Sequence, residues 1–379
     1  MLTESRSSER RSRLIRTAAA ALVLVLLPGC GTLYLLQAAH GEAQVLHRRR
    51  PIAKVIRNPK TPPPLRVELE QVRAARRFAS EVLGLPRNRS YRTYSDVGRP
   101  YVVWNVVAAP EFSIVPKHWC YPIVGCVAYR GYFSERAARR FAARLAARGY
   151  DVYLGGVPAY STLGRFADPV LSTMIPYGSV ELASIIFHEL AHQLLYVRGD
   201  SRFDEAFATT VEHEGVRRWL LYRGKLAALA RYEQENALEL QYVRLFRRAR
   251  TALAALYASG VPKRVMLARK RARLAALAAA MRKLGREFPG KGPPPYEDWL
   301  ESGINNADLA SVATYYDCVP GFERLLADDE GDLQRFYSEV RALAREPQRK
   351  RDAAVCLSAQ RSVELRNRSN RAGTASVPK

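Results

Sequence analysis

The spacing of hydrophobic and polar positions changes near residue 180 of the 379-residue chain. Before this point, short runs of β-branched and aromatic residues are interrupted by glycine and proline, which is typical of strands. After it, apolar residues recur at helical spacing up to residue 258, and again over 263–284 and 307–344. The pattern predicts an α+β fold in which a small N-terminal mixed sheet packs on a predominantly helical region.

Two helices are also expected in the first half of the chain. Residues 65–85 have helical periodicity and contain strong helix formers. Ser134, followed by an acidic first turn, starts a second helix that stops at Gly149. Strands are expected over 91–132, 151–160 and 170–174.

Two segments lack helical or strand periodicity. The prolines between residues 51 and 64 predict an extended spacer. Residues 347–379 are polar and basic, which predicts a disordered tail unless a disulfide from Cys356 holds its first part. The chain is therefore divided into a leader over 1–29, an N-terminal segment and spacer over 30–64, a main domain over 65–346, and this tail.

The first 29 residues are predicted to be a secretory signal. Five arginines precede an apolar run over 17–27, which is too short to span a bilayer comfortably. The sequence Leu27-Pro28-Gly29-Cys30 then predicts cleavage before Cys30 and a lipid on its thiol, as in bacterial lipoproteins. We therefore expect the protein on the periplasmic side of the cell envelope, anchored to a bacterial membrane by its lipid. The alternatives are an uncleaved anchor and an ordinary signal peptide cut nearby.

The other cysteines are consistent with an oxidising compartment. Without Cys30 four remain, an even number. Cys120 and Cys126 flank a stretch whose proline and glycine suit a turn, so a local disulfide is favoured there. A bond between Cys318 and Cys356 would then follow by default. Metal binding by these cysteines is disfavoured because the chain has no Cys-x-x-Cys pair.

One segment, His188-Glu189-Leu190-Ala191-His192, carries residues for metal chemistry. Two histidines four residues apart project from the same face of a helix and can bind one metal ion. Glu189 lies beside them, where it can take a proton from a metal-bound water. The alternative interpretation is a pair of core histidines on an amphipathic helix.

Glu205 is predicted to be the third metal ligand. The helix should end near Gly199, and a second helix should start at Asp204, whose carboxylate can cap it. A helix–turn–helix connection of this length can bring Glu205 back over the helix face that carries His188 and His192. Two neutral histidines and one carboxylate leave a fourth tetrahedral position open for water, which marks a catalytic zinc site. Alternatively, Glu205 is only an acid that the helix dipole favours in a first turn.

Three further titratable residues have weaker patterns. Glu212 lies two turns beyond Glu205 on the same face, where it can hold a ligand histidine by its outer nitrogen. An ordinary surface acid is the alternative for this residue. His118 and His213 have no partner pattern and are expected to be structural.

The metal segment resembles the active-site pattern of gluzincin metallopeptidases. Those enzymes have His-Glu-Leu-Ala-His-Gln, then Asn-Glu-Gly-Phe-Ala and a further Glu seven residues on. Here the second motif is Asp204-Glu205-Ala206-Phe207-Ala208, and it follows the first more closely. Over most of residues 29–345 the chain is similar to a family of bacterial zinc aminopeptidases predicted to be lipoproteins. The segments that carry this similarity include Gln37-Ala38-Ala39-x-Gly41, Tyr129-Arg130-Gly131-Tyr132-Phe133, Ala159-Tyr160-Ser161-Thr162-Leu163-Gly164 and Asn305-Asn306-Ala307.

This resemblance implies a zincin-like catalytic region, one Zn²⁺ per chain and peptide substrates. The residues predict hydrolysis by a zinc-activated water, with Glu189 accepting the proton and passing it to the leaving amine. Tyr160, Tyr315 and Tyr316 are candidates to donate a hydrogen bond to the oxyanion, or else core aromatics. Asp168 is a candidate to bind the free ammonium group of the substrate, or else a turn residue.

Two other functions are compatible with the sequence. One is a zinc endopeptidase that acts on envelope proteins. The other is a non-enzymatic basic lipoprotein of the envelope, in which the His-Glu-His segment is merely structural.

The formal net charge of +24 affects which partners are expected. Residues 217–286 hold 18 basic and 3 acidic residues, whereas residues 160–216, with the predicted metal site, hold 3 basic and 8 acidic ones. The basic excess is thus separate from the catalytic segment. It favours an anionic membrane or envelope surface beside the lipid anchor over specific nucleic-acid binding, with a solvated arginine-rich face as the alternative.

Overall fold

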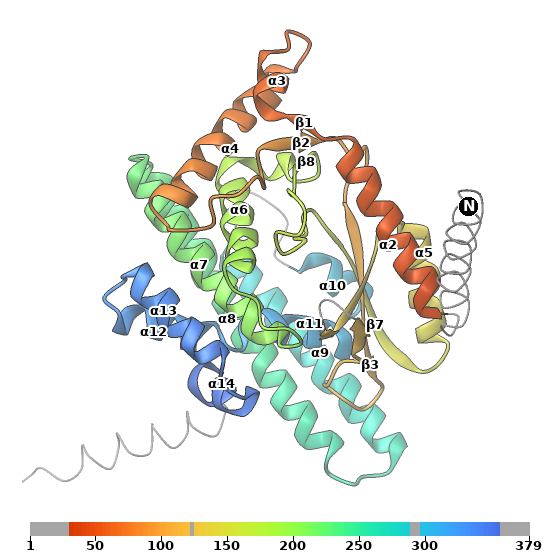
Figure 1. Ribbon diagram of the computed structural model, residues 1–379. Helices are drawn as coiled ribbons and strands as arrows, with labels where there is room; N and C mark the ends of the chain where they lie inside the picture. Colours follow the sequence, from red (N-terminus) through yellow and green to blue (C-terminus); the bar gives the residue numbers. More distant parts are fainter. Residues whose placement is uncertain (1–29, 122–124, 289–295, 357–379) are drawn as a thin grey trace, which may run out of the picture.

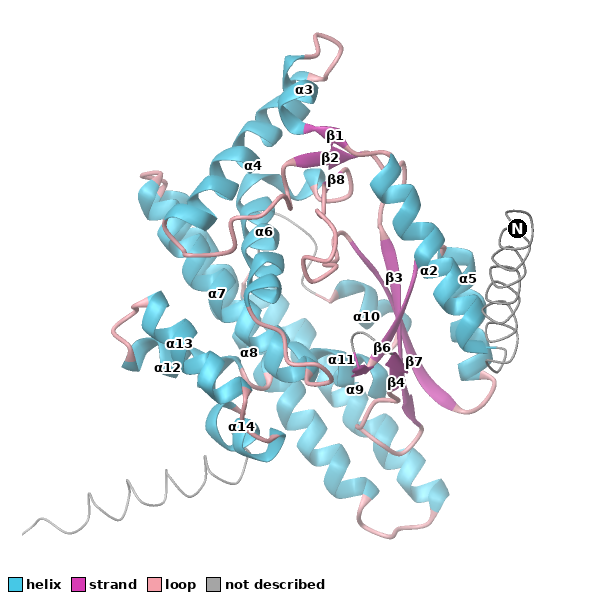
Figure 2. Ribbon diagram, in the orientation of Figure 1, coloured by secondary structure: helices cyan, strands magenta, loops and turns pink. Residues whose placement is uncertain are grey.

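A computed structural model describes residues 30–121, 125–288 and 296–356 (Figure 1). Helices predominate, and the strands form two three-stranded sheets and one two-stranded hairpin (Figure 2). The predicted α+β fold, with small sheets in the N-terminal half and helices beyond them, is confirmed. The predicted signal over 1–29 lies outside the described residues.

The elements have the following bounds. The strands are β1 (Arg50–Pro51), β2 (Thr93–Ser95), β3 (Val103–Pro110), β4 (Trp119–Tyr121), β5 (Gly125–Val127), β6 (Tyr129–Tyr132), β7 (Tyr150–Val157) and β8 (Val170–Leu171). The helices are α2 (Cys30–His47), α3 (Ile52–Arg57), α4 (Pro63–Glu81), α5 (Glu135–Ala146), the 3₁₀ turn η1 (Ile175–Tyr177), α6 (Gly178–Leu194), α7 (Ser201–Tyr222), α8 (Leu226–Tyr257), α9 (Lys263–Glu287), α10 (Glu297–Ser302), α11 (Asn306–Tyr316), α12 (Val319–Asp328), α13 (Leu333–Ala344) and α14 (Gln348–Val355).

One sheet is antiparallel and is buried on both faces. Its central strand β3 pairs with β6 on one side and with β7 on the other. Because side chains alternate along a strand, Trp104 and Val106 pack toward α5, while Val107 and Ala109 pack toward α11. Helix α11 also contacts α7, so it connects this sheet to the helical part of the molecule.

The second sheet is small and mixed. Strand β2 pairs antiparallel with β1 and parallel with β8. It joins the N-terminal segment to β8, and η1 then leads directly into α6. Helix α6 packs between α4 and α7, with Leu182, Ile186 and Leu190 fully buried in the main core.

The N-terminal segment is folded, and the prediction of an extended spacer over residues 51–64 was wrong. Pro51 is the N-cap of α3, and Pro63 is the first residue of α4. A proline at a helix start loses no hydrogen bond, because the first N–H groups of a helix have no partner within it. Ile52 at the start of α3 is only 2 % exposed and belongs to the main core.

Helix α2 is likewise part of the folded body. Figure 1 shows it running alongside the antiparallel sheet, and it contacts the edge strand β6. None of the described helices has both the length and the apolar character that crossing a membrane requires.

Helices α8 and α9 pack against each other around a separate apolar core and include most of the basic region over 217–286. They lie at the lower edge of the view in Figure 1. The basic excess of the sequence is thus concentrated in one structural unit. Its contact with an anionic surface remains a prediction.

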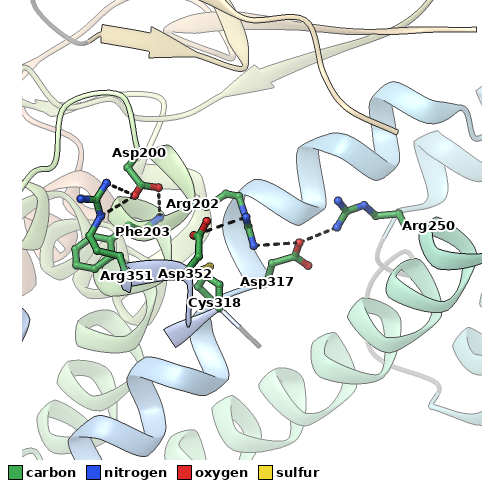
Figure 3. Close-up of a disulfide and its surroundings, with 9 residues drawn as sticks. Asp200, Arg202, Phe203, Arg250, Asp317, Cys318, Arg351 and Asp352 are labelled. Atoms are coloured by element: carbon green, nitrogen blue, oxygen red, sulfur yellow. Dashed lines mark hydrogen bonds and ion pairs between the residues drawn. A yellow bond between two sulfur atoms is a disulfide. The ribbon is translucent and has the colours of Figure 1, made fainter. Parts of the chain in front are cut away.

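The two predicted disulfides are confirmed, and the second one orders the start of the predicted tail. Helix α14 precedes Cys356, so the disulfide holds the first part of this segment, which is the exception predicted from the sequence. Residues 357–379 lie outside the described residues. Figure 3 shows the ion pairs beside the Cys318–Cys356 bond. Arg351 donates to Asp200 at 2.6 and 2.9 Å, and Asp200 is the N-cap of α7.

The same region contains a second set of charged contacts (Figure 3). Arg202 lies 3.9 Å from both Asp317 and Asp352, and Asp317 also accepts a hydrogen bond of 2.8 Å from Arg250. These contacts join α7, α8 and α14 near the first turn of α7. They therefore help to fix the helix that carries Glu205.

Candidate active site

The predicted metal-binding helix is α6, and its two histidines face α7. His188 and His192 are one turn apart, and their Nε2 atoms lie 3.1 Å from each other. The Oε2 atom of Glu205 on α7 lies 3.3 Å from Nε2 of His188 and 3.5 Å from Nε2 of His192. The structure therefore brings together the three residues that the sequence predicts as ligands.

The spacing of these three atoms fits a zinc ion. At metal–ligand distances of about 2.0–2.1 Å, the edges of a tetrahedron around zinc are roughly 3.3–3.4 Å. The three observed distances of 3.1, 3.3 and 3.5 Å bracket this value. Two imidazole nitrogens this close to each other and to a carboxylate are stabilised by a cation between them. The donor set of two nitrogens and one oxygen matches a catalytic zinc site.

A short turn brings Glu205 into place. Helix α7 begins at Ser201, three residues before the predicted start, and its N-cap is Asp200, which accepts a hydrogen bond from the backbone N–H of Phe203. The prediction that Asp204 caps this helix was wrong. Asp204 instead accepts a hydrogen bond of 2.7 Å from the backbone N–H of Val197, which holds the turn between α6 and α7. Burial raises the pKa of Asp204 to about 9.

Glu212 contacts His188 through Nδ1, the ring nitrogen that does not face Glu205. Its Oε2 atom lies 2.9 Å from Nδ1 of His188, and its Oε1 atom accepts a hydrogen bond from Ser184. With Nδ1–H donated to Glu212, the Nε2 atom of His188 keeps its lone pair for a metal ion. Ser184 was missed in the sequence, although it lies one turn before His188 on the same face of α6.

The electrostatics of the three ligands favour a bound cation. Burial opposes the charge on Glu205, but the two histidines outweigh it and lower the pKa of this carboxyl to about 2. Burial also lowers the pKa of His188, but its hydrogen bonds with Glu205 and Glu212 outweigh burial and raise that pKa well above its usual value. The carboxylates thus attract positive charge to Nε2 of His188, either a proton or a metal ion.

These residues open into a cavity of about 520 Å³, the active-site pocket. His188, Glu189, His192 and Glu205 form part of its wall. The opposite parts of the wall come from α2, from the strands β3, β5 and β6, and from residues 157–165. The side chains of the three predicted metal ligands are 9–14 % exposed, so they are largely buried but still within reach of a molecule in the pocket. The volume suits a short peptide or a chain end.

The three tyrosines predicted as oxyanion donors differ in position. Tyr315, at the end of α11, lines the pocket, and the described residues include no hydrogen-bond partner for its hydroxyl. Tyr160 also lines the pocket, but its hydroxyl donates to Glu42. Tyr316 does not line the pocket, and its hydroxyl is hydrogen-bonded to Glu239.

The negative charge of Glu205 affects the pKa of Tyr315. Glu205 and, after it, burial raise the pKa of this tyrosine well above 10. The hydroxyl is therefore protonated at neutral pH and available as a donor. Tyr129 on β6 and Tyr196 after α6 also line the pocket and were missed, since their sequence neighbourhoods show only strand and helix-end patterns.

Asp168 does not line the pocket. Its side chain is buried, and its carboxylate accepts hydrogen bonds from the N–H and hydroxyl of Thr162 and from the amide of Gln193. It therefore holds the pocket loop over 160–165 against α6. Among the described residues that line the pocket, Glu42 and Asp204 each have one buried carboxylate oxygen without a hydrogen-bond partner.

His118 and His213, the two histidines expected to be structural, lie apart from the three predicted ligands. His213 is 3.4 Å from Glu323, and His118 precedes β4. Neither lines the active-site pocket.

Comparison with known proteins gives one match. No curated protein and no solved structure is significantly similar to the chain. The model of the family described as "Putative aminopeptidase" matches residues 33–355, which include all the residues that line the pocket. The chain therefore belongs to this aminopeptidase family.

Proposed function

We propose that the protein is a zinc-dependent aminopeptidase that uses Glu189 as its general base. The observation that carries this proposal is the triangle of ligand atoms at tetrahedral spacing, with Glu189 in the wall of the same pocket. His188, His192 and Glu205 would hold the ion, and Glu212 would orient His188.

The chain supplies groups for each part of amide hydrolysis. Bound at this site, zinc would polarise the scissile carbonyl and lower the pKa of water. Glu189 accepts a proton from the attacking water and then donates it to the leaving amine. Tyr315 donates a hydrogen bond to the oxygen on which negative charge develops. Because the sheet and α2 cover the site, these groups act in a partly desolvated pocket, where their charges interact more strongly than in water.

Metal analysis and a peptidase assay test this function together. We expect about one zinc per purified mature chain and hydrolysis of aminoacyl anilides, which a chelator abolishes and added zinc restores. Well-folded protein without zinc would contradict the metal site. Zinc-dependent cleavage within N-terminally blocked peptides, but not of free aminoacyl anilides, would identify an endopeptidase instead.

The Tyr315→Phe variant is expected to lower kcat by roughly 100- to 1,000-fold, because it removes one donor to the oxyanion. Zinc content and thermal stability should stay the same, since the Tyr315 hydroxyl has no hydrogen-bond partner among the described residues. Tyr316→Phe is the matched control, because this neighbouring side chain of α11 does not line the pocket. Equal rates for both variants in a steady-state assay would exclude Tyr315 as the donor.

We also propose that a lipid on Cys30 anchors the enzyme to a membrane of the cell envelope. The mature chain would then begin with α2, a wall of the active-site pocket. Residue 42 lies 12 residues after Cys30, or about 18 Å along a helix, so the pocket would be held close to the membrane surface.

Replacing Cys30 with serine is expected to move the protein from the membrane fraction to the soluble periplasmic fraction, because the thiol that carries the lipid is lost. Fractionation with an antibody, together with labelling by a radioactive fatty acid, measures this change. Unaltered membrane association without label incorporation in either protein would show that the leader is an uncleaved anchor.

A further inference from the structure

Glu42 on α2 lines the active-site pocket, and one of its two carboxylate oxygens is buried without a hydrogen-bond partner. Its Oε2 atom accepts a hydrogen bond from Tyr160, whereas its Oε1 atom is buried without a hydrogen-bond partner. Besides burial, the charge of Asp168 raises the pKa of Glu42 and that of Arg49 lowers it. The Arg49 guanidinium donates to the carbonyls of Leu46 and Ala167, and the described residues include no ion pair between Arg49 and Glu42. A buried carboxylate oxygen in this state is costly unless a donor or cation pairs with it.

Two contacts of α2 place Glu42 at this position. The amide of Gln37 makes two hydrogen bonds of 3.3 Å with the edge strand β6 and the residue after it, to the carbonyl of Gly131 and from the N–H of Phe133. One turn further on, Gly41 packs on the ring of Phe133 so closely that a Cβ atom would lie 2.1 Å from it. Glycine at 41 is thus required for α2 to approach the sheet, and the next residue is Glu42.

Tyr160, the hydrogen-bond partner of Glu42, is held in place by the same phenylalanine that contacts α2, Phe133. The ring of Tyr160 packs edge-on against Phe133, with 5.5 Å between the ring centres. Both Tyr160 and Glu42 line the pocket that Glu189 and the metal ligands line.

We infer that Glu42, held by Tyr160, binds the α-ammonium group of the substrate and thereby restricts the enzyme to peptides with a free N-terminus. The assignment rests on the proposed aminopeptidase function and names the group that makes it an exopeptidase. An ammonium group carries three N–H donors and a positive charge, and can therefore supply the hydrogen bond that Oε1 of Glu42 does not have. Burial raises the pKa of Glu42, and a bound cation would offset this effect.

The surroundings of Glu42 also indicate the first side chain of the substrate. Apolar residues of the pocket wall include Leu35, Ala38 and Ala39 on α2, Val157 at the end of β7, and Ala159 after this strand. These side chains are apolar and present no charge to the first residue of the peptide. Substrates with an apolar N-terminal residue are therefore expected to be preferred.

The activity test compares leucine p-nitroanilide with its N-acetylated form. The wild-type enzyme is expected to prefer the free amine by about 100-fold in kcat/KM, and Glu42→Gln to lower kcat/KM for the free amine by about 10- to 100-fold. Its kcat/KM for the acetylated form should stay unchanged. Glu70→Gln, an exposed acid on α4, is the control for loss of one charge.

A binding test separates the ammonium site from catalysis. Leucinamide and N-acetyl-leucinamide are titrated by calorimetry into the Glu189→Gln protein, with and without Glu42→Gln. Leucinamide should bind about 10- to 100-fold more weakly when Glu42 is replaced by glutamine. N-acetyl-leucinamide should bind with the same affinity whether residue 42 is glutamate or glutamine, because it has no ammonium group. The Glu42→Asp variant keeps the charge on a shorter side chain, so its affinity for leucinamide should lie between those of the proteins with glutamate and glutamine at position 42. This variant also serves if Glu42→Gln does not fold.

The outcomes distinguish the two proposals. Equal loss of activity on both substrates in Glu42→Gln, or unchanged leucinamide binding, would overturn the assignment of Glu42 and leave the peptidase function standing. A zinc-loaded wild-type enzyme that prefers the acetylated form would overturn both the assignment of Glu42 and the aminopeptidase function, and would leave only a zinc-dependent hydrolase. If neither substrate is hydrolysed but leucinamide binds in a Glu42-dependent manner, the proposed function fails and the ammonium site is supported.

Discussion

Replacing Glu189 with glutamine is expected to lower kcat by about 100- to 10,000-fold while zinc stays bound at one ion per chain. The amide has the size of the carboxylate but accepts no proton from water, so the loss is one of general-base catalysis. Glu189 lines the pocket beside the three ligands and is not itself one of them. Steady-state kinetics on leucine p-nitroanilide and elemental analysis of the same preparation measure the two quantities.

The control for this experiment is Glu70→Gln, which removes an exposed carboxylate on α4 and should change neither quantity. Loss of zinc from Glu189→Gln would show that Glu189 is a ligand. Full activity with bound zinc would show that another group accepts the proton.

Replacing Glu205 with alanine is expected to weaken zinc binding by about 1,000-fold or more. Apparent zinc-binding free energies of about 10–16 kcal/mol are shared among three or four ligands, so one ligand contributes on the order of 3–4 kcal/mol. Glu212→Ala should cost only about 10- to 100-fold, because Glu212 acts through His188. Competition with a zinc chelator of known affinity gives both dissociation constants.

The two variants form a matched pair. Both remove a buried carboxylate from the same helix, α7, and both carboxylates lie against His188. Equal effects on zinc affinity would therefore contradict the assignment of Glu205 as the third ligand. A larger effect of Glu212→Ala would exchange the two roles.

The cluster of His188, His192 and Glu205 was predicted from the sequence because its geometry is almost entirely local. The pitch of a helix places His188 and His192 on one face whatever the rest of the chain does. A short turn followed by a second helix then limits where Glu205 can lie. The start of α7 was predicted three residues late, because Asp200 and Asp204 are both good capping residues and only the folded turn shows which of them caps.

The ammonium-binding group was not predicted, because its position depends on contacts between distant segments. Asp168 has a residue type that suits the role, but its carboxylate is consumed by Thr162 and Gln193. Glu42 reaches the pocket only because α2 docks on β6, more than 90 residues further along the chain. The spacer prediction failed for a related reason, since prolines that interrupt a helix also start one.

By itself, the sequence determined the α+β class, the helix that presents His188 and His192 on one face, and the local disulfide between Cys120 and Cys126, since each follows from periodicity or short spacing. Only the tertiary structure decided that Tyr315 rather than Tyr316 faces the pocket, and that the N-terminal helix forms one of its walls. Backbone periodicity fixes which residues share a face of a helix. Which face of a helix meets which neighbour is set by the packing of side chains between elements. For α2, the contact of Gly41 with Phe133 determines that Glu42 lies at the pocket.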